Sequence, residues 1–282
     1  MNTPARNVKS IGDAGLAQRP SQLDRVFGYT GVHFEGFFEW FGRLGIFLWQ
    51  TVKAGVTPPF EWREFVHQLD EIGSKSVPLV ALAGAAIGVV LSMEARVNLA
   101  RFGAKALLPA AIVFAVVMEM GPIITGLVVG GRVGAGIGAE LASMKVTEQI
   151  DAIEASAINP YRLLVVTRIL ACILVLPLLT LVGDLCGVIM GWLTQALAES
   201  ISLHQFIDTG FQGATFNAFF PPTFKTAVFG FIIGLISCFE GMRTEGGAAG
   251  VGRAATSSVV LSSLFVILAD VVLVKLILII FP

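Results

Sequence analysis

The residue that most clearly has the chemistry of a site is Glu119, a carboxylate within the apolar stretch 106–131. A charge at the centre of a membrane-spanning helix costs about 2.5–3.5 kcal/mol on insertion scales, so it normally faces a cavity or a partner group. We therefore interpret Glu119 as a binding residue. The alternative is a hydrogen bond to a neighbouring helix that only fixes packing, and for Asp184 and Asp270 this packing role is the preferred interpretation. Glu94 lies near enough to the end of an apolar stretch to be hydrated.

A second candidate surface follows at about 138–156, where the chain becomes amphipathic. The apolar and charged residues of this pattern are Ile137, Leu141, Met144, Ile150 and Ile153 against Glu140, Lys145, Glu148, Asp151 and Glu154. Thr147 is expected to cap a short second helix, and Asn159-Pro160 is expected to end the segment. Such a helix suits the docking of a soluble partner. The alternative is an interfacial helix that only supports the bundle.

Several kinds of chemistry have no matching pattern. The run Gly134–Gly138 is similar to a nucleotide-binding glycine loop, but it follows an apolar span instead of a strand, and no Gly-Lys-Ser/Thr sequence occurs. Because nucleophile-elbow and H-E-x-x-H sequences are also missing, we do not expect an enzyme. The three histidines are scattered and the three cysteines lack C-x-x-C spacing, so no metal is predicted. A net charge of -1 argues against nucleic-acid binding.

The elements that must position these residues are membrane helices. Hydrophobic residues make up 55% of the 282 positions and charged residues 14%, with a mean hydropathy of +0.80, which is outside the range of ordinary soluble domains. A helix needs about 20 apolar residues to cross the hydrocarbon core. Five stretches meet this requirement, at about 77–95, 106–131, 163–196, 221–240 and 254–280. Pro177 predicts a kink in the third.

The chain before these spans has a different character. Residues 32–55 are rich in Phe and Trp but are interrupted by charges, which predicts a helix lying in the membrane interface, with a sixth span as the alternative. Residues 1–31 have no apolar core, so we expect a flexible cytosolic segment and not a secretory signal. Lys and Arg number 14 on the side of the N-terminus and 4 on the other, which favours a cytosolic N-terminus. The cluster from Arg96 to Lys105 runs against this rule, and lipid headgroup contact is its only apparent explanation.

Glycine spacing predicts close packing between the spans. Small residues at every fourth position let membrane helices approach through their backbones, because lipid offers no hydrophobic drive for association. The glycines spaced in this way are Gly84 and Gly88; Gly126, Gly130, Gly134 and Gly138; Gly183, Gly187 and Gly191; and Gly230 and Gly234. Chance spacing in a chain with 31 glycines is the alternative for any one pair.

Two long blocks of sequence resemble the MlaE-type permeases, the membrane subunits of ABC transporters that move lipids together with MCE proteins. The resemblance covers about residues 35–280. The first block contains Glu119-Met120-Gly121-Pro122, Gly131-Arg132-Val133-Gly134, Met144-Lys145-Val146-Thr147-Glu148-Gln149-Ile150-Asp151-Ala152 and Asn159-Pro160. The second contains Gly246-Gly247-Ala248 and Gly250-Val251-Gly252-Arg253-Ala254.

The resemblance implies an all-α integral membrane protein of the bacterial inner membrane. Its permease domain, 32–282, would consist of the interfacial N-terminal helix, five transmembrane helices and a cytosolic coupling helix at about 138–156. The implied partners are a second copy of the chain, a cytosolic ABC ATPase that is MlaF-like, a periplasmic MCE protein that is MlaD-like and a small STAS-domain protein that is MlaB-like. The ATPase uses the ATP, and no cofactor is implied for this chain. The implied substrate is phospholipid or a similar lipid, moved between the inner membrane and the MCE protein so that outer-membrane lipid asymmetry is maintained.

The resemblance also assigns site residues by position. Glu119 matches the acidic residue lining the family's lipid pocket, with Met118, Leu91, Glu94 and Leu99 as its expected companions. The family commonly has Arg where this chain has Met118, and often Gln where it has Glu94. A pocket that loses a cation and gains an acid is expected to handle anionic headgroups less readily. The residues expected to contact the ATPase are Arg132, Glu140, Met144, Lys145, Glu148, Gln149, Asp151 and Glu154.

Two other functions are compatible with a membrane-deep carboxylate. An ion-coupled secondary transporter would use Glu119 to carry the coupling ion, but it predicts inverted repeats with broken helices, and no clear pair is present. A membrane scaffold that anchors the MCE ring without transport is the other alternative. An intact cavity that holds lipid would argue against it.

Overall fold

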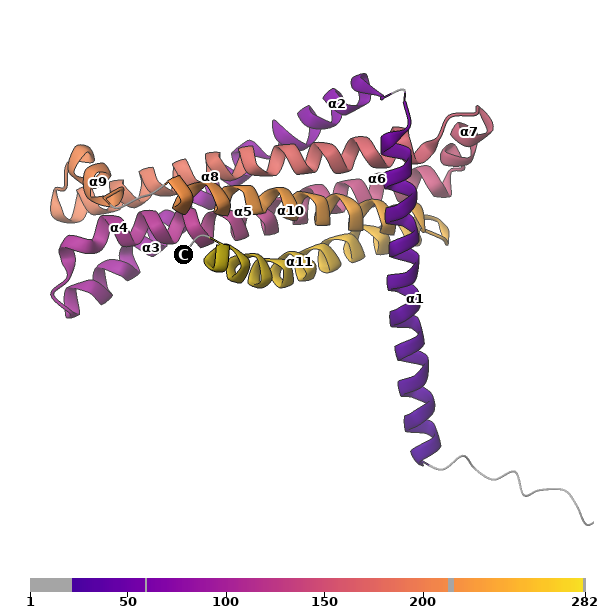
Figure 1. Cartoon of the computed structure of the whole chain (residues 1–282), viewed down its shortest axis with the longest axis horizontal. Coiled ribbons are helices and arrows are strands. Elements are labelled where there is room, and N and C mark those ends of the chain that lie inside the picture. The colour runs from indigo at the N-terminus through magenta and orange to yellow at the C-terminus, as the bar shows by residue number, and fades with distance from the viewer. Residues whose placement is uncertain (1–21, 59, 213–215, 281–282) are drawn as a thin grey trace, which may run out of the picture. The chain divides into compact units, whose positions relative to one another are not determined.

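The computed structural model describes residues 22–58, 60–212 and 216–280 (Figure 1). Throughout these ranges the regular elements are helices, which confirms the predicted all-α class. Five helical stretches are long and apolar enough to cross a membrane, which also agrees with the sequence prediction. They are Trp62–Arg101, Lys105–Val146, Tyr161–Glu199, Phe220–Met242 and Gly247–Ile280.

Residues 1–46 form one unit and residues 47–282 another, and each is considered by itself. Helix α1 (Gln22–Val56) occupies the described part of the first unit. Arg43 and Glu39 lie one helical turn apart there and pair at 2.6 Å. Opposite charges at this spacing support a helix, so the charges that interrupt the aromatic residues of α1 do not break it.

Helix α1 contains the helix expected at 32–55 and begins before it. It is not one of the candidate spans in the described part of the chain, which speaks against the sixth span. Its position in the membrane interface stays a prediction. Of the predicted flexible segment 1–31, residues 1–21 lie outside the described residues, and the remainder belongs to α1.

The second unit begins at Phe47 within α1 and continues with α2, and its second span is a single helical run made of six consecutive elements. The run passes through two π-helical turns, η2 and η3, before it reaches α6. The elements of the unit are α2 (Trp62–Gly73), α3 (Val77–Arg101), η1 (Lys105–Leu107), α4 (Leu108–Ala115), η2 (Val116–Met120), α5 (Gly121–Val129), η3 (Gly130–Gly134), α6 (Ala135–Val146), α7 (Gln149–Ala155), η4 (Tyr161–Val166), α8 (Thr167–Glu199), α9 (Leu203–Gly210), α10 (Phe216–Met242) and α11 (Gly247–Ile280).

Glycines bring α3 and α8 into backbone contact. A Cβ added at Gly84 would lie 2.2 Å from the Gly183 carbonyl oxygen, and one added at Gly88 would lie 2.0 Å from that of Gly187. No side chain fits at either position, so the predicted glycine packing is present here. Similar contacts join α10 to α8, where a Cβ at Gly230 would lie 2.4 Å from the carbonyl oxygen of Cys172.

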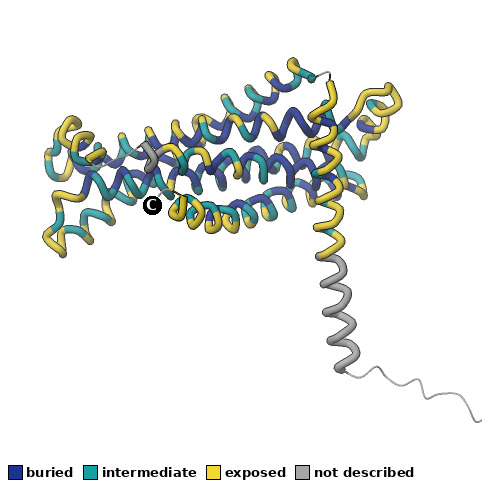
Figure 2. The backbone as a smooth tube through the Cα atoms, in the orientation of Figure 1, coloured by how far each residue is buried: buried dark blue, intermediate teal, exposed yellow. Residues whose placement is uncertain are grey.

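The core lies along α8, α10 and the second span, while α11 is the least covered of the five candidate spans (Figure 2). Only 11% of the most apolar stretch of α11 is buried, against 67% for α10. Helix α7 lies at one end of the bundle and α9 at the other (Figure 1). The segment expected to contact a cytosolic partner and the connection between the third and fourth spans, which contains α9, therefore lie at opposite ends of the spans.

The expected cap at Thr147 is wrong. Its hydroxyl donates back to the Ser143 carbonyl at 2.8 Å, and Glu148, in the left-handed conformation at φ 59°, directly precedes α7. The reversed turn at Glu148 separates the Thr147 hydroxyl from the free N–H groups of α7. At Pro177, where a kink was expected, α8 is a single helix that continues on both sides of the proline.

Candidate functional site

Glu119 and Met118 lie in η2, the first of the two π-helical turns in the second span. Pro122 follows this turn and has no N–H, so it cannot donate to the Met118 carbonyl in the α-helical pattern. That carbonyl instead accepts a hydrogen bond from Lys225 Nζ on α10 at 3.2 Å. Single π-helical turns of this kind are frequent at functional sites. The sequence around Pro122 thus places an available carbonyl oxygen beside the predicted site carboxylate.

Lys225 connects three elements through two carboxylates. Its Nζ lies 3.2 Å from Glu119 Oε2 and 2.9 Å from Asp270 Oδ1 on α11. The exposed fractions of the side chains are 2% for Lys225, 10% for Asp270 and 39% for Glu119. Asp270 is therefore committed to the buried pair, while Glu119 is the member that can still contact a ligand. With one cation and two carboxylates, the Glu119–Lys225–Asp270 cluster has a formal charge of -1.

Lys225 is the functional residue that the sequence interpretation missed. It is one of the four Lys and Arg residues assigned above to the side away from the N-terminus, although it lies within the span predicted at 221–240, where a buried cation needs a partner. The expected loss of a cation at Met118 is consequently offset, because Lys225 brings a cation to the neighbouring carboxylate. For Asp270 the preferred packing interpretation agrees with its pairing to Lys225.

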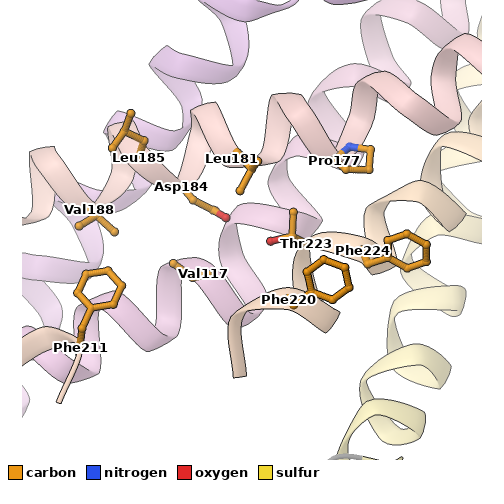
Figure 3. Close-up of a pocket in the computed structure, with 10 residues that line it drawn as sticks. All are labelled: Val117, Pro177, Leu181, Asp184, Leu185, Val188, Phe211, Phe220, Thr223 and Phe224. Atoms are coloured by element: carbon orange, nitrogen blue, oxygen red, sulfur yellow. The ribbon is translucent and has the colours of Figure 1, made fainter. Parts of the chain in front are cut away.

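A largely apolar cavity of about 520 Å³ lies beside η2, between α8 and α10 (Figure 3). Its lining includes Val117, Leu181, Val188, Phe220 and Phe224. The volume is within the range of pockets that hold small apolar ligands. Glu119, Lys225 and Asp270 do not line the cavity, but Val117 directly precedes Met118 and Phe224 directly precedes Lys225, so the same two chain segments carry residues of the cavity and of the cluster.

Asp184 contributes a carboxylate to this cavity from the middle of α8 (Figure 3). The residue is 5% exposed, and neither carboxylate oxygen has a hydrogen-bond partner among the described residues. A Cβ added at Gly121 would lie 1.6 Å from Asp184 Oδ1, so only glycine leaves room for the carboxylate. Asp184 does not make the interhelical hydrogen bond that its packing interpretation requires.

The other predicted lipid-binding residues lie elsewhere on α3. Leu91 and Leu99 pack against the apolar cluster that α4 forms around Ile112 and Val113, and Glu94 is exposed. None of the three lines the cavity of Figure 3. The described structure brings Met118 and Glu119 together with Lys225, while the contacts of Leu91, Glu94 and Leu99 with lipid stay predictions.

The predicted ATPase-contacting residues fall into two groups. Some hold the fold: Arg132 donates to Ser76 Oγ at 2.7 Å, and Glu140 pairs at 2.8 Å with Arg168, whose side chain is 2% exposed. Lys145 pairs with Asp151 at 2.7 Å across the turn into α7, and Met144 is half-buried. The exposed members at this end of the bundle include Glu148, Gln149 and Glu154. Because Ile150 is buried, α7 presents an acidic face from a fixed position.

Comparison with known proteins identifies relatives over most of the chain. The family described as Permease MlaE matches residues 65–276. A probable ABC transporter permease protein of Rickettsia typhi is 35% identical over 90% of this chain and 98% of its own length. The protein TRIGALACTOSYLDIACYLGLYCEROL 1 of Arabidopsis thaliana, a chloroplast protein, is 33% identical over 79% of this chain and 64% of its own length. A probable ABC transporter permease protein of a Synechocystis strain is 31% identical over 74% of this chain and 79% of its own.

Proposed function

Because the chain belongs to the MlaE permease family, we propose that this ABC transporter permease moves phospholipid or a similar lipid. The observation that carries the proposal is the Glu119–Lys225–Asp270 cluster, which places charge inside an apolar bundle beside a cavity of about 520 Å³. A lipid has both an apolar body and a polar headgroup, so it matches both features. The Arabidopsis relative supports this substrate class, because its name, TRIGALACTOSYLDIACYLGLYCEROL 1, is the name of a galactolipid.

Glu119 is the residue proposed to meet the headgroup. Its carboxylate is 39% exposed and is held beside Lys225, so a headgroup that approaches it meets both an acceptor and a cation. The apolar chains would occupy the cavity beside η2 and extend between the two subunits of a homodimer, where Leu91, Glu94 and Leu99 are the expected companions. The largely uncovered face of α11 leaves room for contact with a second copy or with lipid.

The partners proposed for the complex are arranged by the two ends of the bundle. A cytosolic ABC ATPase that hydrolyses the ATP would bind the acidic face of α7 through Glu148, Gln149 and Glu154. A STAS-domain protein would accompany the ATPase, and a periplasmic MCE protein would exchange lipid at the opposite end. The proposed location is the bacterial inner membrane with the N-terminus in the cytosol, where transport by the complex would maintain outer-membrane lipid asymmetry.

Glu119→Gln tests the proposed headgroup contact. The variant keeps the shape of the side chain, and Lys225 retains Asp270 and the Met118 carbonyl as partners, so the fold is expected to persist. The complete complex is reconstituted in phospholipid vesicles, and ATP-dependent transfer of a fluorescent phospholipid is measured. We expect transfer to fall at least about tenfold, the effect of losing one charged hydrogen bond. The matched control is Glu71→Gln on α2, whose side chain is 43% exposed and pairs with Lys75. Unchanged transfer by Glu119→Gln would refute the contact.

The same vesicles distinguish the proposed transporter from its rivals. ATP-driven transfer requires the ATPase subunit, whereas an ion-coupled transporter would continue without it when a proton gradient is imposed. A scaffold would bind the MCE protein but would move no lipid under either condition. Transfer driven by the gradient in the absence of the ATPase would therefore replace the proposed mechanism with ion coupling.

A further inference from the structure

A second groove lies between α3 and α8, on a different face of α3 from Leu91 and Leu99. It has a volume of about 860 Å³ and is lined mainly by apolar side chains, including Met93 and Val97 on α3 and Leu193 and Leu197 on α8. The closely packed glycine pairs of these helices end where the groove begins. Beyond Gly88, Ser92 donates to the Gly191 carbonyl oxygen at 3.0 Å, so a hydrogen bond replaces the direct backbone contact.

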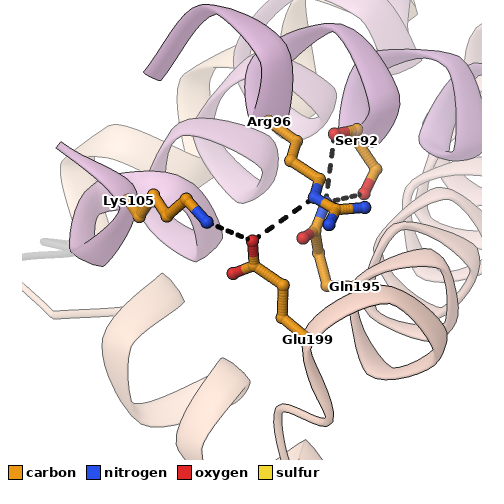
Figure 4. Close-up of polar contacts among 5 residues, drawn as sticks. All are labelled: Ser92, Arg96, Lys105, Gln195 and Glu199. Carbon is orange, nitrogen blue, oxygen red and sulfur yellow. Dashed lines mark hydrogen bonds and ion pairs between the residues drawn. The ribbon is translucent and has the colours of Figure 1, made fainter. Parts of the chain in front are cut away.

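Polar contacts fix the two helices beneath this α3–α8 groove. Gln195 on α8 donates to the carbonyl oxygen of Ser92 at 3.0 Å, and both residues are fully buried (Figure 4). Hydrogen bonds of this kind between membrane helices stabilise one relative position of the helices. The groove is therefore a preformed feature of the fold and does not need a ligand to open it.

Two cations stand at the end of the groove and share one carboxylate. Arg96 Nε lies 3.3 Å from Glu199 Oε1, and Lys105 Nζ lies 2.8 Å from the same oxygen (Figure 4). Both cations line the groove, and their side chains are 41% and 56% exposed. A single carboxylate balances only one of the two positive charges. The Arg96–Lys105–Glu199 cluster thus has a formal charge of +1 and retains donors for a further anion.

The height of this cluster matches the position of a phospholipid phosphate. Arg96 lies in the last turns of the first candidate span, Lys105 begins the second and Glu199 ends the third. Helix ends of membrane spans meet the headgroup region, where basic side chains attract anionic lipids. From there the apolar lining runs back along α3 and α8 toward the centre of the spans, in the direction that an acyl chain takes.

We propose that the α3–α8 groove binds one anionic phospholipid of the surrounding bilayer, with its phosphate on Arg96 and Lys105 and an acyl chain along Met93 and Leu197. The charge surplus favours a phospholipid over the helix of a partner protein, because such a helix would have to bring an acidic residue to this one level. The groove is separate from the Glu119 turn. The proposed site is therefore distinct from the proposed headgroup contact at Glu119, and it explains why basic residues occur on the predicted outer side.

The test measures lipid binding by native mass spectrometry of the full-length chain in detergent. The two probes are phosphatidylglycerol and a diacylglycerol with the same acyl chains, which lacks the phosphate. We expect Arg96→Gln combined with Lys105→Gln to weaken phosphatidylglycerol binding about tenfold or more and to leave diacylglycerol binding unchanged. Arg101→Gln is the matched control, since this exposed cation ends α3 but does not line the groove.

Glu199→Gln gives a change in the opposite direction and does not depend on the double variant being well folded. It releases both cations from their internal partner, so phosphatidylglycerol should bind several-fold more tightly. If the cations served only to pair with Glu199, this substitution would not improve lipid binding, and the proposal would be overturned. The proposal would also be overturned if Arg101→Gln weakened phosphatidylglycerol binding as much as the double variant does. A third test places a photoreactive residue at Met93 in the intact complex, and capture of a polypeptide and no phospholipid would overturn the proposal as well.

Discussion

Replacement of Lys225 by Met should destabilise the protein strongly, because it removes the cation from the Glu119–Lys225–Asp270 cluster. The ammonium group is 2% exposed and lies 2.9 Å from an Asp270 carboxylate that is itself 10% exposed. After the substitution Asp270 remains buried without its counter-charge. Glu119 is affected less, because it is 39% exposed and can regain hydration.

The size of the effect follows from this difference in exposure. Breaking a buried ion pair by removing one partner costs about 3–5 kcal/mol, whereas an exposed pair is worth about 0–1 kcal/mol. We assign the first value to Lys225–Asp270 and the second to Lys225–Glu119. The free energy of unfolding of Lys225→Met should therefore fall by about 3–5 kcal/mol. Combining it with Asp270→Asn should recover most of this loss, because no uncompensated charge then remains at the buried end.

The assay is unfolding of the purified chain in mild detergent by titration with sodium dodecyl sulfate, followed by circular dichroism. Lys275→Met is the matched control, since this lysine also lies in a candidate span but is exposed. It should unfold like the unsubstituted chain. A Lys225→Met variant as stable as this control, or a double variant no more stable than Lys225→Met alone, would refute the reasoning.

Three further outcomes are expected. Gly88→Ala places a Cβ 2.0 Å from a carbonyl oxygen of α8 and should lower the free energy of unfolding by at least about 1–3 kcal/mol. Gly252→Ala has open space around the added Cβ and should not lower it. Equal effects of the two substitutions in the same titration would contradict the backbone packing of α3 against α8. Glu140→Gln should destabilise the chain more than Arg168→Met. It leaves the 2% exposed guanidinium of Arg168 without its counter-charge, whereas Arg168→Met leaves a 55% exposed carboxylate that water can solvate. The opposite order of stability would disprove that Arg168 is the buried member of the pair. Glu154→Lys should reduce co-purification of the ATPase without altering stability, and full recovery of the ATPase would count against docking at α7.

The spans were predictable from sequence because length and hydropathy alone determine whether a helix can cross the bilayer. Helix ends were less so. The second span was expected to end near residue 131, yet the helix continues to Val146. Hydropathy predicts which residues lie in the hydrocarbon core, but it does not predict the residue at which helical hydrogen bonding ends. The conformation of Glu148 was missed for a related reason, since a left-handed residue that is not glycine has no compositional signal.

The site was predictable only in part because its partners are distant in sequence. Glu119 was found from its own neighbours, but Lys225 lies 106 residues away and Asp270 further still. Lys225 and Asp270 each indicate from sequence that a buried charge needs a partner, but the sequence around them does not identify that partner. The same limit applies to Glu140, whose pairing with the buried Arg168 28 residues away has no signal in its own neighbourhood, while its contact with the ATPase stays a prediction.

The second candidate span connects the proposed headgroup contact to the proposed ATPase contact. From Lys105 to Val146 it is one helical run that contains Glu119 in its π-helical turn and ends next to α7. A Cβ at Gly138 would lie 2.3 Å from a serine hydroxyl of α11, and one at Gly241 of α10 would lie 2.6 Å from the Leu141 side chain. Because α6 packs so closely against both helices, we expect a force on α7 to be transmitted to α10 and α11. These two helices carry Lys225 and Asp270, so in the proposed mechanism ATP-driven movement at one end of the bundle would reach the charges that surround Glu119.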